Sequence, residues 1–204
     1  YMGCYAAAVA LRSARHIVRS EPAARVLVLT VELCSLHLHE MTELEPMLAG
    51  LQFGDGAAAA LVSADPQGLA LDAPFSATLP ESDELIRWDI TDQGFVMQLS
   101  GEVPGRIGAA LAEPDMRERI VNGGVDQWAV HAGGRSILDA VESALQLPPD
   151  ALDDSRAVLR DYGNMSSSTL MFVLARQLER TIDSGVAIAF GPGLAAEGFR
   201  FRSA

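Results

Sequence analysis

Strand-like apolar runs alternate with helical segments along this chain, and this alternation limits the folds that it can adopt. Residues 25–32 (RVLVLTVE) form an unbroken run rich in leucine and valine, which predicts a strand buried on both faces. Residues 57–63 predict a second buried strand after a tight turn at Gly54 and Gly56. Strands that alternate with helices pack as α/β layers, so the predicted fold class is α/β.

Periodicity, glycine and proline delimit the remaining elements. Apolar residues at helical spacing predict helices, and short alternating segments between Pro, Asp and Gly predict antiparallel strands with a hairpin at residues 92–94. The predicted helices are residues 4–19, 41–51, 103–112, 136–147, 155–161 and 166–180. The further predicted strands are residues 69–79, 84–91, 94–100, 127–131, 185–190 and 197–202.

Composition narrows the classes of function. The chain has 204 residues, 49% hydrophobic and 21% charged, which is enough apolar material for a sizeable core. A net charge of −12 repels phosphate backbones, so nucleic acid is not an expected partner. The longest uninterrupted apolar run, residues 4–11, is too short to span a bilayer. Two cysteines exclude a disulfide scaffold and fit a reducing cytoplasm, which is the expected location.

Three residues supply a nucleophile, an acid–base group and an amide donor. Cys4 falls in the predicted first turn of a helix, where the helix dipole favours a thiolate, although a lone cysteine also fits a small buried side chain. His131 ends a predicted strand ahead of Gly133 and Gly134, where it is either presented to a cleft or part of the core. Asn164 is either a helix N-cap or a donor to a developing oxyanion. Together they suffice for thioester chemistry, but spacing alone does not show that they meet.

The other candidate ligands and nucleophiles give weaker signals. Cys34 follows a buried strand and is interpreted as a small apolar side chain. His37 and His39 stand at i and i+2, as in the start of a metal site, but no nearby cluster of Asp or Cys completes it, so no metal is expected. Gly191 and Gly193 flank a proline and predict a tight turn that does not match a dinucleotide or phosphate loop.

Five motifs stand along the chain in an order that resembles one family. They are Gly3-Cys4-Tyr5-Ala6-Ala7, Phe53-Gly54-Asp55-Gly56-Ala57-Ala58-Ala59, Trp128-Ala129-Val130-His131-Ala132-Gly133-Gly134, Tyr162-Gly163-Asn164-Met165-Ser166-Ser167 and Phe190-Gly191-Pro192-Gly193-Leu194. This order resembles that of type III polyketide synthases, the chalcone and stilbene synthase-like enzymes. The resemblance implies a thiolase-like αβαβα layered sandwich, here incomplete at the N-terminus. It divides the chain into residues 1–65, the end of an N-terminal half with the nucleophile helix, and residues 66–204, a C-terminal half.

The resemblance also implies an activity. Members condense malonyl-CoA with a starter acyl-CoA by decarboxylation and then cyclise the product, as homodimers, with coenzyme A thioesters as substrates and no further cofactor. Cys4 would carry the growing chain. His131 would keep the thiol ionised and, with Asn164, bind the thioester oxygen and stabilise the enolate formed from malonyl-CoA.

Further residues match the family's substrate cavity. Phe53 matches the aromatic gatekeeper at the coenzyme A tunnel, and Met97 stands near the second gatekeeper position, which is a phenylalanine in the family. His37 falls where plant enzymes carry a small hydroxyl residue, and Ala132 replaces the proline after the catalytic histidine. These departures favour a bacterial-type enzyme with a long-chain starter that gives alkylpyrones or alkylresorcinols. The expected substrate-binding residues are Phe53, His37, Met97, Gly133, Gly134, Gly191, Pro192 and Gly193.

Two alternatives stay open. Ketoacyl-acyl carrier protein synthase III uses the same three residue types on the same fold, but it follows its histidine with Gln-Ala-Asn, and here Ala132, Gly133 and Gly134 follow. The second alternative is an inactive fragment that acts as a dimerisation module. The chain begins inside a predicted helix, and family members are nearly twice as long, so we expect it to be part of a longer polypeptide. Alone, it is expected to be inactive and to associate with itself through exposed apolar surface.

Overall fold

The computed structural model describes residues 2–37, 47–48, 50–92 and 94–204. Its helices are α1 (Ala6–Ser20), α3 (Val103–Ala112), α4 (Pro114–Val121), α5 (Arg135–Leu145), α6 (Asp153–Tyr162) and α7 (Ser167–Gln177), with 3₁₀ turns η1 (Gly3–Tyr5), η2 (Cys34–His37) and η3 (Pro192–Leu194). Its strands are β1 (Val26–Glu32), β2 (Gly56–Val62), β3 (Leu69–Thr78), β4 (Ile86–Thr91), β5 (Gly94–Leu99), β6 (Gln127–Val130), β7 (Gly185–Gly191) and β8 (Ala195–Ser203).

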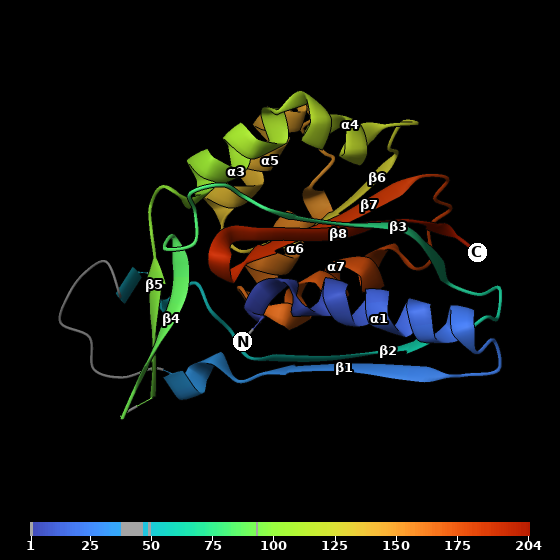
Figure 1. The fold of residues 1–204 in the computed structure, drawn as a ribbon, viewed down its shortest axis with the longest axis horizontal. Helices are drawn as coiled ribbons and strands as arrows, with labels where there is room; N and C mark the ends of the chain where they lie inside the picture. Colours follow the sequence, from blue (N-terminus) through green and yellow to red (C-terminus); the bar gives the residue numbers. More distant parts are fainter. Residues whose placement is uncertain (1, 38–46, 49, 93) are drawn as a thin grey trace.

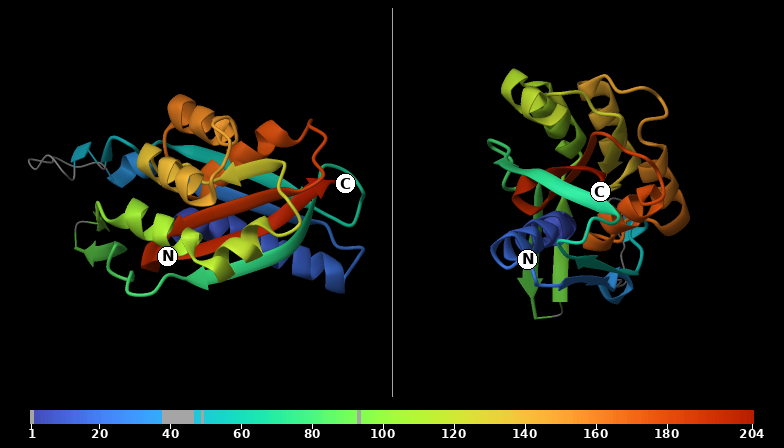
Figure 2. Two further views of the ribbon diagram at one scale, coloured as in Figure 1. Left: turned by 90° about the horizontal axis from the view of Figure 1, so that it is seen from above. Right: turned by 90° about the vertical axis from the view of Figure 1, so that its right-hand side faces the viewer.

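A four-stranded sheet in the order β3-β8-β7-β6 lies at the centre of the molecule (Figure 1). Strands β6 and β7 run parallel, and the other pairs are antiparallel. Helices α3, α4 and α5 lie on one side of this sheet, and α1 and α7 lie on the other, as the right-hand view in Figure 2 also shows. The predicted α/β class is therefore confirmed.

Strand β7 divides the core in two because its side chains alternate between the faces of the sheet. All seven of its residues are buried. Val186, Ile188 and Phe190 pack in the cluster with α3 and α5. Ala187 and Ala189 pack in the cluster with α1 and α7. The small alanine side chains leave room for α1 and α7 to approach the sheet closely, and these two helices carry or adjoin the site described below.

The prediction that residues 25–32 are buried on both faces is wrong. Strands β1 and β2 form a separate antiparallel pair below α1 and α7. Val28 and Thr30 face the helices and are buried, but Leu27, Leu29 and Val31 are 59–66% exposed. The two helices cover one face of the pair, and no described residue covers the other. Strand β2 alternates in the same way, so its predicted burial is also wrong.

Other elements agree with the sequence to within one to three residues at most ends. The predicted hairpin at residues 92–94 joins β4 to β5. Helix α4 was not predicted, because its sequence PDMRERIV has few apolar residues; Pro114 ends α3 and begins α4. The predicted helix at residues 41–51 lies largely outside the described residues. No helix among the described residues is long and apolar enough to cross a membrane.

Candidate active site

Cys4 lies in the 3₁₀ turn η1, directly before α1, and this turn packs against the end of β7. A Cβ atom at Gly191 would lie 2.7 Å from the Tyr5 ring and 3.4 Å from the Cys4 backbone nitrogen. A Cβ atom at Gly3 would lie 3.0 Å from the ring of Pro192, and the φ of Gly3 is +55°. Glycine at positions 3 and 191 therefore allows the Gly-Pro-Gly segment to contact the turn that carries Cys4, and Gly193 takes the left-handed φ of +70° in that loop.

Ser166 connects Cys4 to Asn164. The Cys4 thiol donates to Ser166 Oγ, with 3.8 Å between Sγ and Oγ. The backbone nitrogen of Ser166 donates to Asn164 Oδ1 at 2.9 Å. Ser166 has a φ of 48°, which is costly for a residue other than glycine and marks this loop as strained. Ser166, not Asn164, is the N-cap position of α7, so the predicted N-cap role of Asn164 is wrong.

His131 lies directly after β6, and its backbone nitrogen donates to the Ile188 oxygen at 2.8 Å. The side chain is 1% exposed, and neither ring nitrogen has a hydrogen-bond partner. Gly133 turns back over it, with its nitrogen 3.0 Å from the His131 oxygen, and a Cβ atom at Gly133 would lie 3.3 Å from Nε2. A buried polar group without a partner is costly, so this imidazole is a candidate for binding a polar ligand atom.

The amide of Asn164 reaches the loop that follows His131. Its Nδ2 donates to the Gly133 oxygen at 3.2 Å, which leaves one N–H of the same amide for another acceptor. A continuous series of contacts thus runs from Cys4 through Ser166 and Asn164 to Gly133 and His131. The structure brings the three predicted catalytic residues into one cluster. The sequence analysis did not single out Ser166, and its unusual φ cannot be deduced from sequence.

The segment around Phe53 is bound to the backbone of Asn164. Asn164 N donates to Gln52 O at 2.8 Å, and Gly54 N donates to Asn164 O at 3.0 Å, which makes a parallel bridge between Phe53 and Asn164. A Cβ atom at Gly54 would lie 2.3 Å from the Tyr162 carbonyl oxygen. The glycine is therefore required by close backbone contact, in addition to the tight turn that the sequence predicts.

Gly56 and Gly134 also lie too close to neighbouring atoms to carry a side chain. A Cβ atom at Gly56 would lie 2.4 Å from the sulfur of Met165, and one at Gly134 would lie 2.9 Å from Gln52 Oε1. The Gly-Asp-Gly, Gly-Gly and Gly-Asn-Met motifs, far apart in the sequence, are therefore packed against one another at the site.

Burial controls the protonation of both reactive groups. Burial raises the pKa of the Cys4 thiol to about 11, opposed by hydrogen bonds with Ser166 and Asn164 and assisted by the charge of Glu32. Burial lowers the pKa of His131 to about 4. Burial thus favours the uncharged form of both groups, and the ionised thiol beside His131 that the resemblance implies stays a prediction.

His37 and Met97 lie around a tryptophan that the sequence analysis did not single out. The rings of His37 and Trp88 have centroids 5.7 Å apart, and Met97 is the cross-strand partner of Trp88 in the β4–β5 hairpin. The hairpin also contacts η3, which joins it to the Gly-Pro-Gly loop beside Cys4. His39 lies outside the described residues. Among those described, no group of three or more His, Cys, Asp or Glu could hold a metal.

Two pockets open near these elements. One of about 270 Å³ adjoins Phe53 and is lined by Cys34, Ser35, Gly50, Gly54 and Asp55. The other, of about 1000 Å³, lies between α1, α7 and the β2–β3 segment and contains none of the predicted site residues. The smaller pocket includes Phe53 and Gly54, which border Asn164 in the parallel bridge described above, and the larger one lies on the half-covered side of the molecule.

The fold matches part of the type III polyketide synthases of known structure. PKS-I from the brown alga Ectocarpus siliculosus matches all of this chain with a TM-score of 0.93 at 32% identity, over 59% of its own length. The 1,3,6,8-tetrahydroxynaphthalene synthase of Streptomyces coelicolor matches 99% of the chain with a TM-score of 0.90 at 31% identity, over 61% of its length.

Sequence comparison agrees. The family descriptions "Chalcone and stilbene synthases, N-terminal domain" and "Chalcone and stilbene synthases, C-terminal domain" match residues 1–66 and 71–204. Type III polyketide synthase A of Arabidopsis thaliana is 32% identical over the whole chain, and the α-pyrone synthesis polyketide synthase-like Pks18 of Mycobacterium tuberculosis is 33% identical over 98% of it. The chain belongs to the chalcone and stilbene synthase family. It spans 56% and 55% of the length of these two relatives.

Proposed function

We propose that this chain carries the catalytic residues of a type III polyketide synthase, an acyltransferase that condenses malonyl-CoA with an acyl-CoA starter and cyclises the product. The observation that carries the proposal is the contact series from Cys4 to His131, which ends at a buried imidazole without a hydrogen-bond partner. A thiol, an imidazole and an amide donor gathered in one cluster supply the groups that thioester transfer requires.

The first step loads the starter onto Cys4. The sulfur attacks the thioester carbonyl, and the thiol proton passes to His131 and then to the departing coenzyme A thiolate. The products are an acyl-Cys4 thioester and free coenzyme A. Asn164 Nδ2–H and the imidazole donate to the carbonyl oxygen as it gains negative charge, and each donor of this kind is worth about 3 kcal/mol.

The second step extends the chain. Malonyl-CoA loses CO₂, and the same donors stabilise the enolate oxygen. The enolate carbon forms a bond to the acyl carbon, the bond from that carbon to Cys4 Sγ breaks, and the released thiolate takes up a proton from water. The β-ketoacyl-CoA product returns for further extension and then cyclises in a cavity bounded by Phe53, Met97, His37 and the Gly191–Gly193 loop. We propose further that the starter is a long-chain acyl-CoA and that the product is an alkylpyrone or an alkylresorcinol.

The proposal extends to the whole protein. It places residues 1–65 in an N-terminal half and residues 66–204 in a C-terminal half of a five-layer αβαβα sandwich, which acts as a cytoplasmic homodimer on coenzyme A thioesters without nucleic acid. The family matches at residues 1–66 and 71–204 support this division. The ketoacyl-acyl carrier protein synthase III alternative is weaker, because the similar proteins above are polyketide synthases.

Intact-mass measurement after mixing with a long-chain acyl-CoA tests the mechanism, with Cys4→Ala as the control. An acyl adduct that is absent in Cys4→Ala supports Cys4 as the nucleophile, and malonyl-CoA extension is then the next assay. An adduct seen only on a chain lengthened at its N-terminus to the size of the relatives supports the mechanism for the longer protein. No adduct on either chain overturns acyl transfer and favours a dimerisation module.

A further inference from the structure

Among the strands that the structure describes, none pairs with one edge of β6, the strand that leads to His131. It is the last strand in the order β3-β8-β7-β6. Along a strand, successive backbone groups point to opposite edges. The nitrogen of His131 bonds to β7, whereas the polar groups of Trp128 and Val130 point to the open edge. These groups are buried and need partners from elsewhere.

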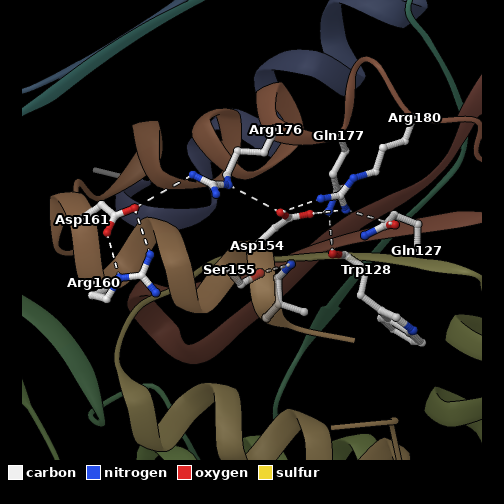
Figure 3. Close-up of polar contacts among 10 residues, drawn as sticks. Gln127, Trp128, Asp154, Ser155, Arg160, Asp161, Arg176, Gln177 and Arg180 are labelled. Carbon is white, nitrogen blue, oxygen red and sulfur yellow. Dashed lines mark hydrogen bonds and ion pairs between the residues drawn. The ribbon is translucent and has the colours of Figure 1, made fainter. Parts of the chain in front are cut away.

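Two side chains satisfy this open edge. Val130 N donates to Ser155 Oγ at 3.2 Å, and Gln177 Nε2 donates to the Trp128 oxygen at 2.9 Å. Ser155 lies in the first turn of α6, and Gln177 is the last residue of α7. The two side chains therefore take the place of a neighbouring strand and attach β6 to both helices, as Figure 3 shows for Gln177 and Trp128.

A buried carboxylate holds Gln177 in this position. Asp154 Oδ2 accepts from Gln177 Nε2 at 3.2 Å, and Arg180 donates to both oxygens of Asp154 at 2.5 Å and 2.9 Å (Figure 3). Arg176 Nε lies 3.4 Å from Oδ1. Paired donors of this kind compensate the cost of burying the charge and fix the geometry of the group.

The helices joined in this way are the two that flank Asn164, because α6 ends at Tyr162 and α7 begins at Ser167. The His131 ring has no hydrogen bond to orient it, so its place depends on its backbone and on packing. The network thus connects the backbone that carries the imidazole to both helices on either side of the amide donor.

We propose that Asp154, Ser155 and Gln177 act as positioning residues that set the His131 imidazole relative to Asn164. This inference rests on the proposed function. None of the three needs to touch substrate. A displacement of about 1 Å in a catalytic group can reduce the rate by about 100-fold, so loss of the network is expected to slow acylation of Cys4 by 10- to 100-fold.

The test compares Gln177→Met and Ser155→Ala with Arg156→Gln. The first two variants remove the two bonds to β6 while keeping similar or smaller volume. Arg156 forms ion pairs with Asp139 and Glu142, which join α6 to α5 and not to β6. Arg156→Gln therefore removes contacts between helices without removing a bond to β6. The measurements are the rate of acyl-Cys4 formation against acyl-CoA concentration, the urea midpoint, and the ¹H–¹⁵N spectrum of the His131 ring.

The expected result is a lower maximal acylation rate in Gln177→Met and Ser155→Ala, an unchanged half-saturating acyl-CoA concentration, and a shifted His131 ring signal. Arg156→Gln should leave the rate and the ring signal unchanged at a comparable loss of stability. The inference is overturned if the acylation rate and the His131 ring signal change in proportion to the loss of stability, measured by the urea midpoint, in all three variants. If neither this chain nor a chain lengthened at its N-terminus forms an adduct, the proposed function fails, and the ring signals alone decide the positioning role. If Gln177→Met does not fold, Ser155→Ala decides it.

Discussion

At the scale of single residues, the site combines a thiol that resists ionisation with an imidazole that resists protonation. Both effects have the same cause, which is burial. The sequence analysis singled out Cys4, His131 and Asn164, and the structure brings them into one cluster, while their roles stay predictions. Their protonation could not be predicted from sequence, because it depends on how many neighbours exclude water from each group. The position of Ser166 between Cys4 and Asn164 was also beyond prediction, since it follows from a left-handed backbone at a non-glycine residue.

The lowered pKa of His131 predicts an acid-sensitive fold. The unfolded chain takes up a proton on this histidine near pH 6.5, but the folded chain does so only near pH 4. Below pH 6.5 the unfolded state therefore binds more protons, and the free energy of unfolding falls as the pH is lowered to 4, by on the order of 3 kcal/mol.

Urea denaturation at pH 4.5 and pH 7 measures this loss. His131→Gln is the control, because it has no titrating group at this position and should lose less stability over the same range. Equal losses in both proteins would contradict the lowered pKa.

Ser166 is expected to influence the reactivity of Cys4. A hydrogen bond from the Ser166 hydroxyl to the thiolate lowers the pKa of Cys4, so Ser166→Ala should raise this pKa further above its usual value. The rate of iodoacetamide alkylation of Cys4, followed by peptide mass spectrometry from pH 7 to 10, should be lower in the variant at each pH. Alkylation of Cys34 in the same sample is the internal control, and a variant that reacts as fast as wild type at Cys4 would refute the hydrogen bond.

At the scale of elements, the motifs of the sequence correspond to contacts between segments. The segments around Gly54 and Asn164 pack so closely that a side chain at Gly54 or at Gly163 would collide with the backbone of the other segment. Sequence analysis predicted the turns, since glycine marks them locally. It did not predict the partner of each turn, because close approach between distant segments has no local pattern. It also missed α4, whose sequence carries no clear apolar period.

A methyl group at Gly54 should therefore destabilise the fold. The Gly54→Ala substitution places Cβ 2.3 Å from the Tyr162 carbonyl, and the backbone there must move, at a cost of about 1–3 kcal/mol. Gly105→Ala is the matched control, because Gly105 lies in α3 with no atom within 4 Å of its Cβ position. It should stabilise the protein by about 0.5–1 kcal/mol through helix propensity. Thermal or urea denaturation of both variants measures the change in the free energy of unfolding. Similar changes in the two variants would refute the prediction.

At the scale of the whole molecule, the main difference from expectation is the half-covered pair β1–β2. An unbroken apolar run predicts that both faces of a strand are buried, and the run at residues 25–32 is of that kind. The described residues bury only one of the two faces of this strand. The layering was predictable because the alternation of elements determines it. Whether a layer is covered on both faces depends on which other segments pack against it. A local sequence pattern does not identify those segments.

The exposed face should cause self-association. Leu27, Leu29 and Val31 form a row of apolar side chains in line with Leu61 on the paired strand, and such patches promote association between copies. Multi-angle light scattering should show concentration-dependent species larger than 21.7 kDa. Leu29→Lys should reduce association, whereas Ile17→Lys, which adds the same charge on α1, should not. A monodisperse monomer at all concentrations would contradict this expectation.

The bridge between Phe53 and Asn164 has a consequence for the chain as a whole. Asn164 is hydrogen-bonded on both sides to Gln52 and Gly54, which come from the other family region of the chain. If the backbone were cut between residues 66 and 71, neither piece would hold a finished site, since one would keep Cys4 and the other His131. The two pieces would have to recombine to restore the cluster. Covalent trapping of an acyl group would then serve as a reporter of fragment complementation.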